Sequence, residues 1–92
     1  MGSKNNPGKF DCYGNALPDE PMFILLARDY RAPFLVERWA VDCLKDIECG
    51  ERPETDRAMA QEAHDCAQAM RDWRTTNFPK WRSPDTLRER ER

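Results

Sequence analysis

The chain lacks any hydrophobic run long enough to cross a bilayer. Its longest apolar run, Met22–Ala27, has six residues in a sequence of 92, whereas a membrane-spanning helix needs about 20. The N-terminus also lacks the apolar h-region of a secretory signal peptide, and the four cysteines show neither a CxxC pair nor the rhythm of a secreted scaffold. We therefore expect a cytoplasmic protein with reduced thiols and no membrane contact.

The sequence also lacks the motifs of common catalytic and metal sites. It contains no glycine-rich phosphate loop, no nucleophile turn and no paired carboxylates at a recognisable catalytic spacing. Its single histidine, His64, is two positions from Cys66, which puts the two side chains on different faces of a helix. A structural zinc site usually has closely spaced ligand pairs. We expect no metal, no cofactor and no enzymatic activity.

The basic residues are too few and too unevenly placed for a nucleic-acid-binding surface. Residues 1–70 carry 8 basic and 13 acidic side chains, whereas residues 71–92 carry 7 basic and 4 acidic ones. Binding of DNA requires a basic field over the folded surface. We therefore expect no DNA binding by the domain, while a contact between the C-terminal tail and an anionic partner stays possible.

What the sequence does contain is the pattern of two amphipathic helices. A stripe of apolar residues runs through residues 30–49 and ends at Gly50, a typical helix stop; it consists of Val36, Ala40, Cys43 and Ile47. A second stripe, at spacings of four, three, four and three, is typical of a heptad seam; it consists of Met59, Ala63, Cys66, Met70 and Trp73. The short connector at residues 50–54 predicts that the helices pack as an antiparallel hairpin.

The segment 18–29 is ambiguous between a short helix and a buried strand. Asp19 is a good N-cap, and Pro21 suits the first turn of a helix. The continuous apolar run Met22–Ala27 is equally compatible with a buried strand. Because only Ile24 in that run is β-branched, we favour a short helix.

The predicted fold is therefore mainly α, with a short N-terminal element followed by the antiparallel hairpin. We expect one compact helical domain over residues 1–78, with residues 1–9 flexible, and a charged tail over residues 79–92. Only 39% of the residues are hydrophobic, which makes the core of so short a chain thin. Small domains of this kind often gain stability by oligomerisation, and we expect an oligomer.

Candidate ligand-binding residues flank the apolar run. Tyr13 precedes the run, while Arg28 and Arg31 follow it. An aromatic face can stack on a nucleotide base, and one guanidinium group can donate two parallel hydrogen bonds to the oxygens of a phosphate. One surface could thus present both groups. The alternative is that Tyr13 only packs and that Arg28 forms an ion pair with an acid such as Glu20.

The same stretch carries a resemblance to a known family. The residues that carry it are the run YGNALPDEPMFILLARDYRAPFLVERWA, followed in the second helix by AMRDW. They resemble small proteins of tailed phages, and in outline the chain is similar to the phage anti-CBASS sponges, which sequester the cyclic oligonucleotide signals of bacterial defence. The resemblance covers about residues 10–73.

The resemblance implies a helical protomer assembled as a hexamer in the host cytoplasm, with cyclic dinucleotides held uncleaved between protomers. It makes Tyr13 the base-stacking group and Arg28 the phosphate contact. Some such sponges also hold cyclic trinucleotides at a separate site, for which Arg71 and Arg74 are the candidates here. The tail after Pro79 lies outside the resemblance.

The alternative function is a helical-hairpin interaction module that inhibits or adapts a host protein. Trp81, which lies between Lys80 and Arg82, and the basic tail would then form the contact surface.

Overall fold

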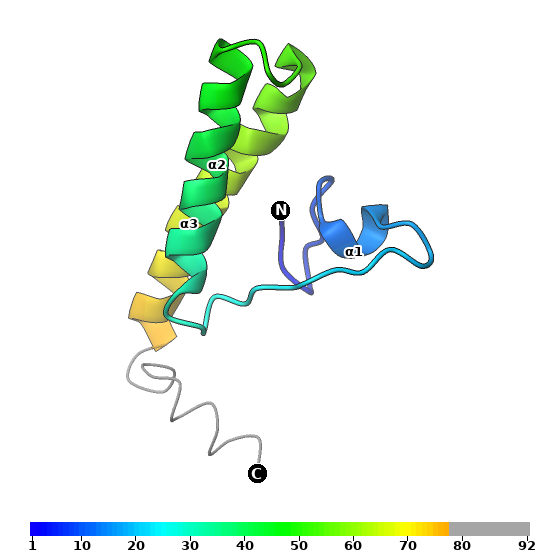
Figure 1. Ribbon diagram of the computed structural model, residues 1–92. Coiled ribbons are helices and arrows are strands. Elements are labelled where there is room, and N and C mark those ends of the chain that lie inside the picture. The colour runs from blue at the N-terminus through cyan, green and yellow to red at the C-terminus, as the bar shows by residue number, and fades with distance from the viewer. Residues whose placement is uncertain (78–92) are drawn as a thin grey trace.

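The computed structural model describes residues 1–77, so the predicted tail at residues 79–92 lies outside the described residues. Helices cover 58% of the described residues and no strand occurs among them, which confirms the prediction of a mainly α chain. Two long helices, α2 (Ala32–Glu48) and α3 (Arg57–Asn77), lie side by side as an antiparallel hairpin (Figure 1). A short 3-10 helix, η1 (Glu54–Asp56), precedes α3.

The turn between the two helices follows from local sequence. Gly50 has a φ of 81°, a left-handed conformation that glycine adopts without steric cost. Its N–H donates to the carbonyl of Ile47, at 3.1 Å, and the N–H of Glu51 donates to that of Asp46, at 2.8 Å. These two bonds form a Schellman motif that satisfies the last carbonyls of α2, and the helix stop predicted at Gly50 is confirmed.

The hairpin core is built from small side chains. On α2 the predicted stripe is confirmed at Ala40, Cys43 and Ile47, which are buried, with Val36 half-buried. On α3 the buried residues are Ala60, Ala63 and Ala67.

The predicted seam of α3 is therefore correct only at Ala63. Met59, Cys66 and Met70 are half-buried at the flanks of the contact, and Trp73 is 40% exposed. Helix axes approach most closely where the side chains between them are smallest. The alanines therefore take the line of closest contact and displace the larger residues to its sides.

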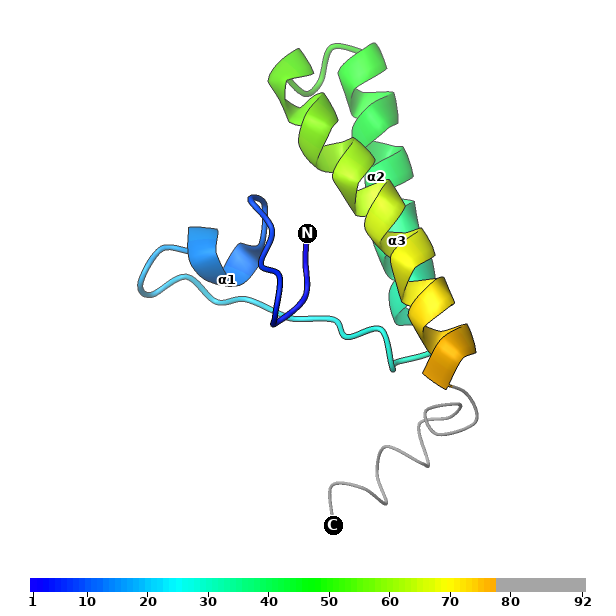
Figure 2. The same ribbon diagram turned by 180° about the vertical axis from the view of Figure 1, so that it is seen from behind.

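The N-terminal arm, residues 1–31, stands to one side of the hairpin. It contains one helical turn, α1 (Cys12–Asn15), and an extended stretch that leads from α1 to α2 (Figures 1 and 2). Within residues 1–77, α1 does not pack against α2 or α3.

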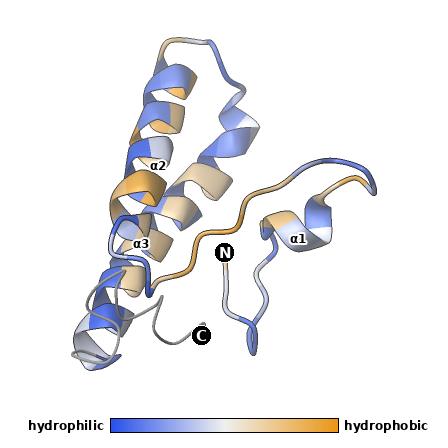
Figure 3. Ribbon diagram, turned by 60° about the horizontal axis from the view of Figure 1, so that its bottom comes forward, coloured by the Kyte–Doolittle hydropathy of each residue, from blue (hydrophilic) through white to orange (hydrophobic). Residues whose placement is uncertain are grey.

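Residues 22–26 of the apolar run belong to this extended stretch and Ala27 begins the turn before α2, so the prediction of a short helix at residues 18–29 is wrong. The run is neither helical nor paired as a strand, and Figure 3 shows it as a hydrophobic segment leading into α2. A short helix depends on the packing of its apolar face, but the Phe23 side chain is 83% exposed. Met22, Ile24 and Leu26 are also about half exposed, so the run lacks the buried apolar face that would stabilise a helix.

Candidate ligand-binding site

A pocket of about 350 Å³ lies at the end of the hairpin where the arm joins it. We call it the open-end pocket, because the connector between α2 and α3 closes the opposite end. Its lining combines aromatic rings from the start of α2 with guanidinium groups from the end of α3: Tyr30, Pro33, Phe34, Arg71, Arg74 and Thr75.

Arg71 ties the two helices together across this pocket. Its Nη1 and Nη2 donate to Oε1 and Oε2 of Glu37, at 3.2 and 3.1 Å, a bidentate pair. The guanidinium also lies 5.5 Å from the ring centroid of Phe34, within the range of a cation–π contact. The carboxylate of Glu37 therefore compensates the charge of Arg71, and a phosphate at this position would have to compete with it.

Arg74 ties α3 to the arm. Its Nη1 donates to the carbonyl oxygen of Arg28 at 2.7 Å and approaches that of Ala27 at 3.4 Å. Both acceptors lie in the turn that joins the arm to α2. Arg74 thus holds the last turn of the arm against the last turns of α3.

Arg31 is exposed beside the open-end pocket. Its Nε donates to Oη of Tyr30 at 3.0 Å, and the guanidinium lies 5.3 Å from the centroid of the same ring. Because Tyr30 lines the pocket, Arg31 places a cation at its edge. Asp29 shapes this corner by accepting the backbone N–H of Arg31 at Oδ1, at 2.9 Å.

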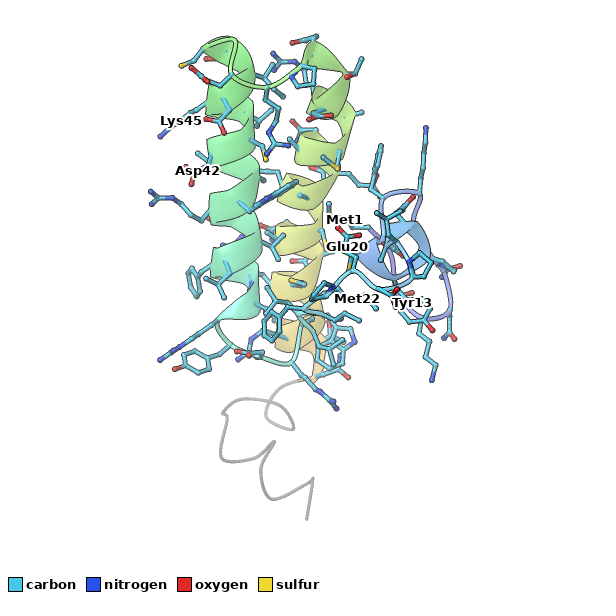
Figure 4. The ribbon with its side chains drawn as sticks, turned by 45° about the vertical axis from the view of Figure 1, so that its right-hand side comes forward. Met1, Tyr13, Glu20, Met22, Asp42 and Lys45 are labelled. Carbon is cyan, nitrogen blue, oxygen red and sulfur yellow. The ribbon has the colours of Figure 1, made fainter. Side chains whose placement is uncertain are left out.

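The structure gathers most of the predicted site residues at the open-end pocket but leaves Tyr13 apart. Arg71 and Arg74 line the pocket, Arg31 contacts its wall, and the carbonyl of Arg28 meets Arg74. Tyr13, in α1, is 76% exposed and lies away from the pocket among the residues of the arm (Figure 4). In a single copy of the chain, Tyr13 and the arginines of the pocket therefore lie apart.

The turn that precedes the apolar run has its own hydrogen bonds. The carboxylate of Glu20 accepts the backbone N–H of Leu17 at 3.0 Å, and the N–H of Glu20 donates back to the carbonyl of Leu17 at 3.1 Å. Glu20, considered above as a partner for Arg28, therefore closes the turn that directs the chain from α1 into the extended run.

Sequence reasoning missed the rings of the pocket. Tyr30 and Phe34 were not selected, although both line it. Their spacing of four residues, at the point where the arm enters α2, was the available signal, because residues four apart share one face of a helix.

The described residues contain no group of three or more His, Cys, Asp or Glu side chains placed to hold a metal ion. Burial raises the pKa of the Cys43 thiol and that of the Cys66 thiol. The thiolate is the nucleophilic form of cysteine, so this environment disfavours thiol chemistry at both positions. No helix within residues 1–77 has the length and apolar character needed to span a membrane.

Comparisons of the chain with protein-family models, with curated proteins and with solved structures found no match. A functional assignment therefore rests on the contacts of the pocket and of the arm.

Proposed function

We propose that the protein is a phage counter-defence protein that binds cyclic oligonucleotide second messengers, without cleaving them, and so blocks CBASS-type immune signalling in the host cytoplasm. The observation that carries this proposal is the open-end pocket, where the rings of Tyr30 and Phe34 lie with the guanidinium group of Arg71, and where Arg31 contacts Tyr30 at the edge. Rings stack on bases and guanidinium groups bind phosphates. A ligand that is only held requires neither a nucleophile nor a metal.

The size of the pocket supports a site shared between copies of the chain. A volume of about 350 Å³ is at the lower end of the range for small-molecule sites, roughly 300–1,000 Å³, and suits part of a cyclic oligonucleotide. Tyr13 is held away from the pocket of its own chain. In the proposed homo-oligomer, a hexamer on the resemblance, the arm of one copy brings Tyr13 to the ligand held by another.

Exposed apolar surface supports the assembly. With about 150–250 Å² per aromatic side chain, the most exposed rings together present roughly 600 Å²; they are Tyr13, Phe23, Phe34, Trp39 and Trp73. Leu17 is also 70% exposed. These residues are spread over α1, the apolar run, α2 and α3. A standard interface buries about 800 Å² on each partner, so assembly of several copies would bury part of this apolar area.

Calorimetry with a panel of cyclic dinucleotides and cyclic trinucleotides tests the proposal. Replacement of Tyr13 or Arg28 by Ala should weaken binding by about 1–3 kcal/mol, the worth of a lost stack or charged hydrogen bond. Tyr13→Phe, which keeps the ring, should retain most of the affinity. Arg38→Ala is the matched control for Arg28, because Arg38 pairs with Asp42 on an exposed face of α2.

Three results would overturn the proposal. The intact oligomer would bind no cyclic nucleotide, or both alanine variants would bind as tightly as the wild type, or heating the complex would release cleaved instead of intact nucleotide. A monomeric native mass in solution would remove the shared site.

The exposed face of α2 favours a second candidate, a helical-hairpin module that inhibits or adapts a host protein. Phe34, Leu35 and Trp39 are 64%, 52% and 41% exposed. Trp81 and the basic tail, predicted as further contacts, lie outside the described residues. A monomeric chain without nucleotide affinity would favour this candidate over the first.

A further inference from the structure

The junction between the arm and the hairpin is held by one side chain from far along the sequence. The carbonyl oxygens of Ala27 and Arg28 both face Nη1 of Arg74, which lies 47 and 46 positions away. Around them, the N–H of Asp29 donates to the carbonyl of Leu26 and the N–H of Ala32 donates to that of Asp29, each at 3.0 Å. The turn is thus closed by its own backbone, and Arg74 anchors it to α3.

The two sides of this junction differ in how firmly they are held. Immediately after it, Ala32 and Pro33 are buried against the hairpin. Before it, residues 22–26 are extended and outside any helix or strand. The far end of the arm has a second attachment, because the N-terminal ammonium of Met1 pairs with Glu62 on α3. Residues 22–26 therefore bridge two attachments, and the one at residues 27–28 sets where this bridge leaves the hairpin.

We infer that Arg74 is a clamp that fixes the direction in which the N-terminal arm leaves the hairpin. By holding the backbone of Arg28, it positions Arg28 and, through residues 22–26, the arm that carries Tyr13 for the ligand, without contacting the phosphate itself. The ligand part of this inference rests on the proposed function, whereas the direction of the arm does not. Arg74 is therefore a positioning residue.

Arg71 provides the matched control. It lies three residues before Arg74 and lines the same pocket, but its hydrogen bonds go to Glu37 on α2. Loss of its guanidinium loosens the contact between the helices and leaves the junction with the arm intact. Arg71→Met and Arg74→Met therefore remove the same chemical group from the same pocket with different consequences.

Electron–electron distance measurements between spin labels report the direction of the arm without any ligand. Cys12 in α1 and Cys49 at the closed end of the hairpin are both exposed, whereas Cys43 is only 2% exposed. The labelled background carries Cys66→Ser together with Glu62→Gln, which removes the ion pair of Met1 with α3. Labelling at Cys12 and Cys49, with dilution by unlabelled protein to suppress distances between copies, gives the distance within one chain.

In this background, the parent chain and Arg71→Met should give a narrow distance distribution, and Arg74→Met a broad one. Arg74→Lys, which keeps a cationic donor, should restore part of the narrow component. Circular dichroism establishes that each variant keeps its helices, and Arg74→Lys serves if Arg74→Met fails to fold. An equally narrow distribution in both Arg74 variants would overturn the clamp.

Binding of a cyclic dinucleotide at several salt concentrations tests the positioning role. Arg74→Met should weaken binding at least tenfold while leaving the slope of log affinity against log salt unchanged. Removal of a side chain that contacts phosphate directly would make the affinity less sensitive to salt, because salt screens contacts between charges, and such a change would overturn the positioning role. If the wild type binds no cyclic nucleotide, the proposed function fails, but the distance distributions still decide whether Arg74 is a clamp.

Discussion

The pair between Arg71 and Glu37 leads to opposite expectations for stability and for ligand affinity. If a phosphate binds at the open-end pocket, it competes with the Glu37 carboxylate for the two N–H groups of Arg71. Replacing Glu37 by Gln removes the competing charge and keeps one acceptor oxygen. We therefore expect Glu37→Gln to lower the stability of the fold and to raise the affinity for an anionic ligand.

The structure sets the size of both effects. Two charges about 4 Å apart interact by about 4 kcal/mol at an effective dielectric constant of ~20, but exposed pairs contribute only ~0.2–1 kcal/mol to stability. The Arg71 and Glu37 side chains are 31% and 39% exposed, and the pair is bidentate. We expect a loss of about 1 kcal/mol, at the upper end of that range, which corresponds to roughly 4–8 °C in Tm for a domain of this size.

We expect Glu37→Gln to change the free energy of ligand binding by the same amount, but in the favourable direction. A gain of about 1 kcal/mol is roughly a fivefold fall in Kd. Thermal unfolding followed by circular dichroism, at one fixed protein concentration because an oligomer's Tm depends on it, gives the first effect. Calorimetry with a cyclic trinucleotide and a cyclic dinucleotide gives the second.

Asp42→Asn is the control for this experiment. Asp42 pairs with Arg38, whose side chain is 79% exposed, and neither residue lines the pocket. Asp42→Asn should therefore change the stability of the fold and the affinity for cyclic nucleotides only slightly. If Glu37→Gln lowers the Tm while the affinity for every cyclic nucleotide stays unchanged or falls, Arg71 serves only to join the helices and the pocket is not a phosphate site.

Three further predictions test the core, the thiols and the arm. Ala63→Leu should destabilise the protein by about 1–3 kcal/mol in denaturant unfolding, because a larger side chain overpacks the line where the helices are closest; unchanged stability would refute the alanine-lined contact. A thiol reagent at pH 8 should modify Cys49, which is exposed, well before Cys43, whose pKa is raised by burial, and equal rates in the native protein would contradict the burial of Cys43. Phe23→Ser, at a side chain that is 83% exposed in one copy, should lower the native mass measured by light scattering while preserving the helices; a full-size assembly in this variant would mean that the apolar run is not part of the interface.

The local features of the hairpin were predictable from the sequence. The apolar stripe at Ala40, Cys43 and Ile47 reflects the helical repeat itself, so it could be identified without knowing which helix packs against it. The stop at Gly50 depends on one residue that adopts a positive φ without strain. A short connector between two such helices leaves little choice but an antiparallel hairpin.

The α3 contact line and the apolar run could not be predicted in the same way. The periodicity of α3 predicted an apolar seam. It could not decide whether the large residues of that seam or the neighbouring alanines face α2, because this depends on how closely α2 approaches. The conformation of Met22–Ala27 depends on whether a surface lies beside it. Both are properties of packing between segments, which a local pattern does not contain.

The same distinction between local pattern and packing applies to the candidate site. From the sequence alone came the kinds of group that a cyclic nucleotide would need, namely Tyr13 and the arginines at positions 28, 31, 71 and 74. Only the tertiary structure decided what each group does. Arg71 meets Glu37 across 34 positions and Arg74 meets the carbonyl of Arg28 across 46. Such partners depend on where the hairpin places its open end, because a guanidinium bonds whichever acceptor the fold brings within 3 Å or so of it.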